Sequence, residues 1–388
     1  MQPNIVNDTL VFVTEGDLYI ASMTSPTAMK LTTTVGNVRT PVLNPIFPYY
    51  VAFTATYTGR REIYLMDLRQ SKRTQPAMRL TYWDSSTGVV NVVGWKNDGM
   101  TLIFSATSRE ISLPDTRLYT LTLAQEGATP SLTKRAASHR PLRALQIEPV
   151  LLSQAIDGVW DDDNKCVYFT RHSQSSKTVR YVGGTAESIW LYCEGQAMAT
   201  EITRNKDYRG TSKSPKLAKV NGQMYLLFLS DRIKNSAEEW IPSSMNLFAL
   251  PLQDEATLYS TPQSNFIQLS EISCQYAGLS LMEYDIDSIT NRIVMRIGAD
   301  LYVMSGGELE ARISNNHKDE DHEIQKLPIV VYSDFHEHQE RLLSIKIPDD
   351  LTSIDTFVTA FGTTATLLGI RGQIFVIPVI EEIGRAHV

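Results

Sequence analysis

Short apolar segments with a central aromatic or aliphatic residue recur along the chain at intervals of roughly 40 to 70 residues, a spacing typical of repeat architectures. They read LVFVT (10–14), VAFTA (51–55), LIFSA (102–106), VYFTR (167–171) and LLFLS (226–230), with IVMR (293–296) as a weaker copy. Each has the length and the β-branched or aromatic composition of a β-strand. The pattern predicts repeated copies of one unit built on such a strand.

Two further elements follow each apolar segment in a constant order. The first usually opens on a polar residue and carries an aromatic residue third, as in DLYIA (17–21), EIYLM (62–66), RLYTL (117–121), SIWLY (188–192), NLFAL (246–250) and DLYVM (300–304). The second ends on a hydroxyl residue, as in KLT (30–32), RLT (79–81), SLT (131–133), EIT (201–203), QLS (268–270) and RIS (312–314). Segments such as VVNVVGW (89–95) would supply a fourth strand.

This repeat predicts an all-β fold, a β-propeller of about six four-stranded blades over residues 1–315, because blades of this length bury their faces against their neighbours. No segment has the pattern of a long amphipathic helix. Tight-turn signals at Asn97-Asp98-Gly99 and Asn221-Gly222 precede two of the apolar strands. We expect each aromatic triplet on an inner strand, with Tyr64, Tyr119 and Trp190 buried between blades.

The pattern changes after residue 315. A charged, His-rich stretch predicts a linker over 316–328, and a seventh copy, TLLGIRGQIFVIPV (366–379), predicts the start of a second propeller over 329–382. The last residues, 383–388, fit no strand or cap, and we expect a non-native tail on an incomplete gene product. A single blade would leave exposed strand edges, which proteins normally avoid.

Composition narrows the functional classes. The net charge of −7 gives no general attraction to nucleic acid or to anionic lipid, and no apolar run approaches the roughly 20 residues needed to cross a bilayer. The start of the chain lacks the features of a signal peptide. The three cysteines, Cys166, Cys193 and Cys274, are predicted to be buried free thiols. Together these features favour the cytoplasm.

No catalytic, cofactor-binding or metal-binding residue can be assigned from motifs. A nucleophile elbow is absent, so the chain is expected to be inactive as a peptidase by itself. The most metal-like group, a candidate zinc site better explained as a solvated linker, comprises His317, Asp319, Glu320, Asp321, His322, Glu323, His336 and His338. The run at 161–164 is interpreted as a surface turn rather than a calcium loop.

Two further groups leave a functional alternative open. Gly183-Gly184 is interpreted as a turn or bulge, with a ligand-cradling role as the alternative. Basic side chains could line a propeller channel and select anionic peptide ends, or they could be ordinary surface charge. The candidates for that role are Arg60, Arg61, Arg171 and Arg180.

The ordered set of repeats resembles the N-terminal half of the tricorn core protease family. The specific passages are the opening LVFVTEGDLYIASM, the run RYVGGT (180–185) followed by SIW (188–190), and the segments from FLSDR (228–232) to IRGQIFVI. The resemblance implies a self-compartmentalising serine peptidase that degrades oligopeptides as a homohexamer without a cofactor, with its PDZ-like and catalytic regions beyond this chain. Where family members can carry an arginine pair, this sequence reads TGVV (87–90).

Two alternatives belong to other classes. A stand-alone propeller could act as a scaffold for protein partners, as translocation propellers do. A prolyl-oligopeptidase-like enzyme could carry the same blades before a hydrolase domain. The passage from 327 to 379 favours a second propeller over a hydrolase domain, and whether this chain is an enzyme stays open at the level of the sequence.

Overall fold

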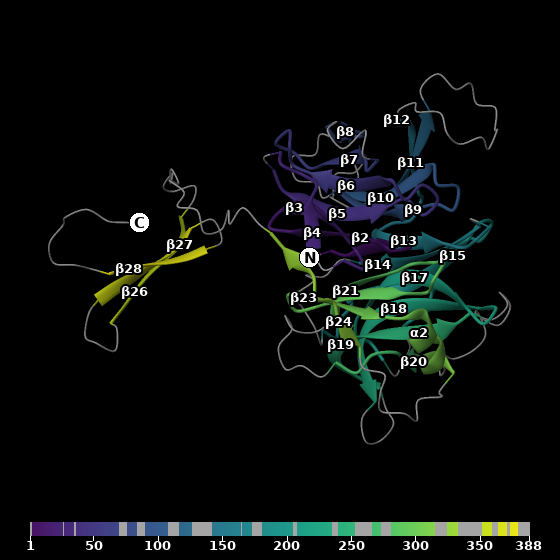
Figure 1. Ribbon diagram of the computed structural model, residues 1–388. Coiled ribbons are helices and arrows are strands. Elements are labelled where there is room, and N and C mark those ends of the chain that lie inside the picture. Colours follow the sequence, from purple (N-terminus) through teal and green to yellow (C-terminus); the bar gives the residue numbers. More distant parts are fainter. Residues whose placement is uncertain are drawn as a thin grey trace. The chain divides into compact units, whose positions relative to one another are not determined.

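The computed structural model shows an all-β protein (Figure 1). It describes residues 2–25, 27–34, 36–69, 76–83, 90–107, 116–125, 142–163, 165–172, 181–204, 208–234, 240–252, 266–272, 281–314, 324–332, 351–358, 364–370 and 373–378. The chain forms two compact units, Met1–Ser333 and Asp334–Val388, each of which is described by itself.

The first unit contains six sheets, each with four consecutive antiparallel strands, which we call blades one to six; the sheet of blade one has one further strand, described below. Blades one to three are β1 (Asn4–Val6), β2 (Thr9–Thr14), β3 (Asp17–Ser22), β4 (Thr27–Lys30); β5 (Val38–Leu43), β6 (Tyr50–Ala55), β7 (Glu62–Asp67), β8 (Met78–Arg79); and β9 (Val90–Trp95), β10 (Thr101–Thr107), β11 (Thr116–Gln125), β12 (Leu142–Pro149). Blades four to six are β13 (Ala155–Trp160), β14 (Cys166–Arg171), β15 (Ser188–Cys193), β16 (Thr200–Glu201); β17 (Ser212–Val220), β18 (Gln223–Lys234), β19 (Trp240–Pro251), β20 (Ile267–Gln268); and β21 (Leu281–Ile286), β22 (Ile293–Ile297), β23 (Asp300–Met304), β24 (Gln325–Lys326).

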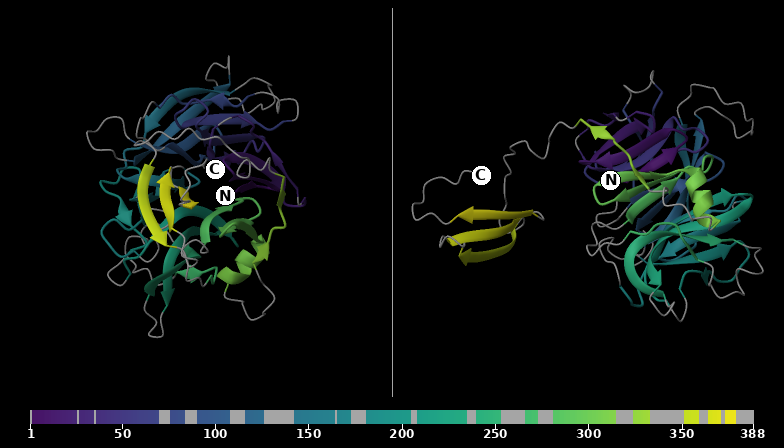
Figure 2. Two further views of the ribbon diagram at one scale, coloured as in Figure 1. Left: turned by 90° about the vertical axis from the view of Figure 1, so that its left-hand side faces the viewer. Right: turned by 60° about the horizontal axis from the view of Figure 1, so that its bottom comes forward.

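The blades close into a ring through their first strands. β1 contacts β5, β5 contacts β9, β9 contacts β13, β13 contacts β17, β17 contacts β21, and β21 contacts β1 again. Figure 2 shows the blades succeeding one another around a common centre. The predicted β-propeller with about six four-stranded blades is therefore confirmed.

The repeat elements occupy fixed strand positions. The apolar segments form the second strand of each blade, from LVFVT in β2 to IVMR in β22. The aromatic triplets form the third strands, which lie between the second and fourth strands of each sheet, so the triplets are on inner strands as predicted. Second strands such as β6 and β10 are buried on both faces between neighbouring blades. Third strands such as β7 are buried over most of their length. A strand buried on both faces is apolar along its length instead of alternating with polar residues, which explains the apolar character of both in the sequence.

The recurring hydroxyl residue has a structural explanation. Thr32 Oγ1 accepts a hydrogen bond from Leu18 N (2.9 Å), and Thr81 Oγ1 accepts one from Ile63 N (2.9 Å). Equivalent bonds in blades four and five join Ile189 N to Thr203 Oγ1 and Leu247 N to Ser270 Oγ, each at 2.9 Å. Each hydroxyl thus ties the segment after the fourth strand to the third strand's triplet, where the sheet ladder has ended.

One repeat element does not follow the rule. Arg312 and Ile313 end helix α2 (Gly306–Ile313), and Ser314 caps it, so the prediction of a strand element for RIS was wrong. Ser305 caps the start of this helix by accepting a hydrogen bond from Glu308 N (3.2 Å). The spacing of Ser305 and Glu308 is a helix-start signal in the sequence. The fourth strand of blade six, β24, lies instead at Gln325–Lys326, within the predicted linker range 316–328.

Aromatic rings stack across the second and third strands of four blades. The pairs are Phe12–Tyr19, Phe53–Tyr64, Phe104–Tyr119 and Phe228–Phe248, with ring centroids 5.3 to 6.0 Å apart. Tyr64 and Tyr119 are 4% and 7% exposed, as predicted. Trp190 is only half-buried, and the Arg171 guanidinium lies over its ring at 4.7 Å from the centroid, a cation–π contact.

Blades six and one lie next to each other, and neither takes any of its four consecutive strands from the other. The buried Asp285 carboxylate accepts hydrogen bonds from Asn4 Nδ2 (2.8 Å) and Ile5 N (2.9 Å) and forms an ion pair with Lys216 Nζ (2.9 Å). Past blade six, β25 (Val330–Val331) pairs in parallel with β4 on the outer edge of blade one. This joint, which we call the seam, therefore depends on side chains and one short added strand.

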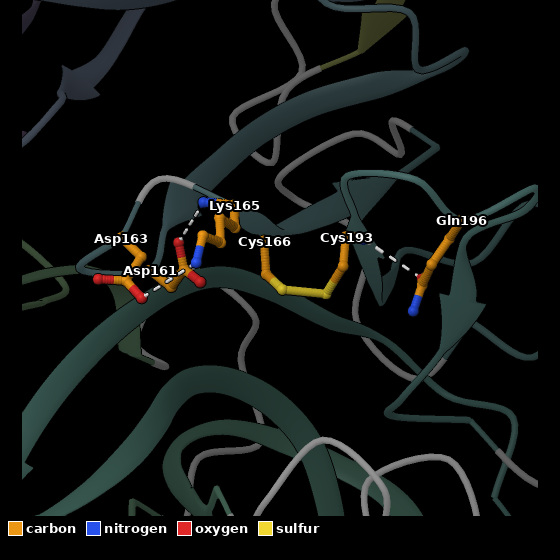
Figure 3. The surroundings of a disulfide bond; sticks show 6 residues. All are labelled: Asp161, Asp163, Lys165, Cys166, Cys193 and Gln196. Carbon is orange, nitrogen blue, oxygen red and sulfur yellow. Dashed lines mark hydrogen bonds and ion pairs between the residues drawn. A yellow bond between two sulfur atoms is a disulfide. The ribbon is translucent and has the colours of Figure 1, made fainter.

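Blade four contains a disulfide. Cys166 and Cys193 lie opposite each other on β14 and β15 and are joined, with their Cα atoms 4.0 Å apart (Figure 3). The prediction that both are free thiols was wrong, because strand register brings together residues that are far apart in the sequence. Cys274 lies outside the described residues. Free cysteines were one reason to expect a reducing compartment, and the disulfide removes that reason, because disulfides persist mainly in oxidising compartments.

Reduction of this disulfide should destabilise the protein. The crosslink closes a chain segment with a sequence separation of 27 residues. The loop-entropy relation for a segment of that length gives a loss of about 3–4 kcal/mol in the free energy of unfolding. Urea unfolding with and without a dithiol reductant measures this loss. The double variant Cys166→Ala/Cys193→Ala is the control, because it has no such disulfide and the reductant should leave its unfolding midpoint unchanged. If the reductant also leaves the midpoint of the natural chain unchanged, the prediction is wrong.

The second unit contains one described sheet of three antiparallel strands, β26 (Leu351–Val358), β27 (Thr364–Ile370) and β28 (Gln373–Pro378). The seventh repeat copy forms the β27–β28 hairpin. Strand alternation places Ile354 and Ile377 on one face and Ile374 and Val376 on the other, and all four are exposed. Both faces of this sheet thus carry apolar side chains. A propeller blade has the same property, because its two faces pack against the neighbouring blades.

Candidate functional site

A pocket of about 340 Å³ lies at one end of blade four, where β14 and β15 are connected. Its lining residues come from the connection before β15, from β16 and from the segment that follows it. They are Val182, Gly183, Gly184, Glu201, Arg204 and Arg209. Backbone, two guanidinium groups and one carboxylate therefore surround the pocket.

The glycine loop is held in a defined shape. Tyr181 Oη and Thr185 Oγ1 lie 3.2 Å apart in a hydrogen bond, and Ala186 N donates to Gly183 O (3.2 Å). A Cβ atom on Gly183 would lie 2.3 Å from Tyr181 Oη, so a larger residue there would require the Tyr181 ring to move. Gly184 has open space at its Cβ position. The predicted turn residues thus form a loop whose backbone also lines the pocket.

Arg204 is anchored to that loop. Its Nη2 donates to Gly183 O (2.9 Å), and its Nε lies 3.9 Å from Glu201 Oε1. The Arg204 side chain is largely buried, so the guanidinium position is fixed by these two contacts and by packing.

Arg209 extends from a clamped segment. Its neighbour Tyr208 is buried and donates hydrogen bonds to Thr211 O (3.2 Å) and to the Asp231 carboxylate. A Cβ on Gly210 would lie 2.4 Å from Tyr208 Oη. The backbone is therefore held closely on both sides of Arg209, whose side chain is exposed and has no ion-pair partner in the part of the chain that the structure describes.

Further positive charge surrounds the pocket. Burial, followed by the charges of Arg171 and Arg204, lowers the pKa of His172, while Glu201 opposes that effect. Among the described residues, the buried Nε of Arg171 has no hydrogen-bond partner. This end of blade four thus has more guanidinium groups than carboxylates, and an anion there would be stabilised.

The arginines that the sequence offered as channel-lining residues do not lie on the first strands of the blades, which form the central ring. Arg60 and Arg61 belong to the β6–β7 connection, and Arg171 ends β14. Burial, followed by the charge of Arg39, lowers the pKa of Arg61. Arg180, the acidic and His-rich stretch 317–323, His336, His338 and the tail 383–388 lie outside the described residues. Asp161 does form a turn, because its Oδ1 accepts a hydrogen bond from Lys165 N (2.8 Å).

Sequence reasoning missed Arg204 and Arg209. Arg204 follows the E-I-T element directly and Arg209 precedes a glycine, which is too weak a pattern to single out either residue. Within the described residues, no group of three or more His, Cys, Asp or Glu side chains could hold a metal ion. No helix of the described chain has the length and apolar character needed to cross a membrane.

The six consecutive four-stranded blades and the ring of first strands define a β-propeller protein. The chain matches the family model of the tricorn protease N-terminal beta propeller domain over residues 1–310, and it belongs to that family. No curated protein matches the sequence significantly.

The chain is also similar to solved structures, of which the first below shows the same fold. The crystal structure of the tricorn protease is 16% identical, with a TM-score of 0.57, and the match covers 98% of this chain and 31% of that one. This chain therefore spans about a third of that protein. The propeller domain of the Trilobed protease from Pyrococcus furiosus is 10% identical, with a TM-score of 0.42, over 84% of this chain and 96% of that domain. TolB from Acinetobacter baumannii is 17% identical, with a TM-score of 0.39, over 65% of this chain and 51% of that one.

Proposed function

We propose that this chain is the propeller region of a tricorn-type serine peptidase and that it guides oligopeptides to or from a catalytic chamber. The observation that carries the proposal is the family match over residues 1–310, together with the six-bladed fold. In the proposed parent protein, the chemistry belongs to regions beyond this chain, and the parent assembles as a homohexamer without a cofactor. A cytoplasmic location stays a prediction from the sequence. The Cys166–Cys193 disulfide argues against it.

The second unit supports the same proposal. Its three-stranded sheet carries exposed isoleucine and valine side chains on both faces, as expected of a blade that requires a neighbour on either side. The predicted linker at 316–328 and the predicted second propeller over 329–382 overlap β24 and β25, which belong to the first unit. We propose that the second propeller begins after these strands and extends to residue 382, before a non-native tail at 383–388. A single hydrolase domain would not require such a sheet.

Peptide binding by the isolated chain tests the proposal. Unfolded, fluorescently labelled oligopeptides should bind saturably with dissociation constants in the micromolar to millimolar range, as measured by anisotropy. A small folded domain with the same label should not bind. No labelled peptide should be hydrolysed, because the chain holds no nucleophile, base and oxyanion set that could be assigned. Absence of peptide binding would contradict the proposed role, and binding of folded domains alone would favour a protein scaffold.

A further inference from the structure

The fourth strand of blade three, β12, differs from the fourth strands of the other five blades. It has eight residues, whereas β4 has four and β8, β16, β20 and β24 have two each. β12 forms the outer edge of its sheet (Figure 1), and its side chains from Arg143 to Pro149 are exposed. Edge strands carry backbone groups that pair readily with another chain, so proteins usually keep such strands short or covered. β12 therefore offers a longer edge for pairing than the other five.

The backbone groups of Ile147 point away from the blade. Val150 N donates to Leu118 O (2.8 Å), so the residue at 150 directs its groups toward β11. In an antiparallel ladder, successive residues direct their groups alternately to one side of the strand and to the other. Ile147 lies three positions before Val150, where the ladder is regular, and its N–H and C=O therefore face outward.

A β-bulge gives Ala144 the same orientation. Gln146 lies opposite Thr122 of β11. The next residue of β11, Leu123, lies opposite Ala144, so the residue at 145 is an extra one in β12. Leu123 N donates to Met100 O (2.8 Å) on the side of β10, and the ladder thus leaves the groups of Ala144 facing outward as well. β12 presents outward-facing donors and acceptors at residues 144 and 147.

These groups and the charges of β12 are complementary to a second β12 in antiparallel register. We propose that two copies of this chain pair through β12 about a two-fold axis, with Ala144 opposite Ile147 of the partner subunit. The outward groups at these two positions then form hydrogen-bonded pairs. The same register places Arg143 opposite Glu148 of the partner subunit, and the two-fold axis repeats that ion pair. Opposite charges directly across a ladder stabilise it.

The ion pairs fix the register and the choice of partner. In the ladder with β11, Arg143 lies opposite Ala124. Glu148 lies opposite Thr120, four positions away, so both charged side chains are on one face of β12. The Glu148 carboxylate accepts a hydrogen bond from Gln146 Nε2 (2.7 Å), which holds it on that face. A register shifted by two residues would separate the charges, so a second copy matches the edge only in the register given above.

Pairing would also remove apolar side chains from water. Leu145 and Ile147 are 59% and 39% exposed, and their partial burial stabilises the dimer. A contact confined to one eight-residue strand per copy is smaller than a standard interface, so we expect a dissociation constant on the order of 10–100 µM. At about 1 µM, a concentration suited to unfolding measurements, the chain is then monomeric. The inference does not rest on the peptidase role proposed above.

Sedimentation velocity of the full chain tests the pairing. From about 1 to about 300 µM, the sedimentation coefficient should rise from that of a monomer to that of a dimer. Arg143→Glu and Glu148→Arg should each weaken the dimer at least about tenfold, because each brings like charges together at both ends of the contact. The double variant Arg143→Glu/Glu148→Arg exchanges the charges and should restore the dimer. Lys219→Glu, which reverses an exposed charge in blade five, is the control and should have no effect.

A further variant separates backbone pairing from charge. Ile147→Pro removes an outward-facing N–H while the ladder with β11 keeps its bonds, so the variant should fold and remain monomeric. Hydrogen–deuterium exchange locates the contact in the natural chain. Exchange in residues 142–149 should be slower at about 300 µM than at about 1 µM, and Ile147→Pro should abolish that difference.

Several results would overturn the inference. A chain that stays monomeric at about 300 µM rules out a second copy and leaves the edge to a strand of another protein. A dimer that neither single reversal weakens, or that the double variant does not restore, rules out the register. A dimer in which exchange slows in β26–β28 and not in β12 belongs to the second unit. Oligopeptide binding is measured separately, so none of these results bears on the peptide role.

Discussion

Arg232→Ala should lower the free energy of unfolding by about 3–5 kcal/mol, the cost of breaking a buried charged cluster. Arg232 is 1% exposed and donates hydrogen bonds to Ser230 Oγ (2.9 Å) and Thr203 O (2.9 Å). Its guanidinium lies over the ring of Phe266 at 3.9 Å from the centroid. The alanine variant would leave the buried Asp231 carboxylate without its cation.

Urea unfolding at pH 7 measures this loss. Burial lowers the pKa of Arg232 to about 10, so the group is still charged at that pH. Arg143→Ala, an exposed arginine of β12, is the matched control and should change the free energy of unfolding by less than about 0.5 kcal/mol. A loss below about 1 kcal/mol for Arg232→Ala would show that the cluster contributes little. Arg232→Lys should not restore stability, because lysine cannot reproduce the planar fork.

Phe104→Ala should cost about 3–5 kcal/mol, the usual range for truncating a buried phenylalanine. Phe104 is fully buried, stacks on Tyr119 at 5.3 Å between centroids, and meets the edge of Trp83 at 5.5 Å. These rings belong to the apolar cluster that joins blades two and three. The truncation would therefore leave a cavity between two blades, which the surrounding strands cannot easily close.

Two controls separate cavity formation from loss of an aromatic group. Phe104→Leu preserves most of the volume and should cost less than about 1.5 kcal/mol. Tyr332→Ala removes an exposed ring and should be nearly neutral. Calorimetry or urea unfolding gives all three values. Equal losses for the alanine and leucine variants at residue 104 would contradict the packing argument.

The sequence predicted the second and third strands well because both carry a local signal. A run such as VAFTA is apolar at all positions except Thr54, since β6 is buried on both faces between blades. A hydroxyl residue recurs at the position of Thr81 because its oxygen accepts a hydrogen bond from the third strand, here from Ile63 N. This contact between distant residues is therefore visible as a sequence motif. Features that repeat with the blade were therefore accessible without coordinates.

Features that depend on register were not accessible. Cys166 and Cys193 face each other only because β14 and β15 pair in one alignment. Arg204 reaches Gly183 O across 21 residues of chain, and no spacing rule connects the two. The identity of the strand that forms the central ring also required coordinates, because the pattern orders strands along the chain without saying which one lies at the centre of the propeller.

The seam between blades six and one has a further consequence for how this architecture can change. Every blade consists of four consecutive strands, so no blade needs residues from both ends of the propeller. A gene duplication that inserted or removed one unit would leave each remaining sheet intact. Where the change falls at the seam, the contacts of Asp285 with Asn4 and Ile5, and the pairing of β25 with β4, would have to form again between new neighbours. A change of blade number at the seam would therefore leave the hydrogen-bonded ladder of each sheet intact and would require new packing between blades.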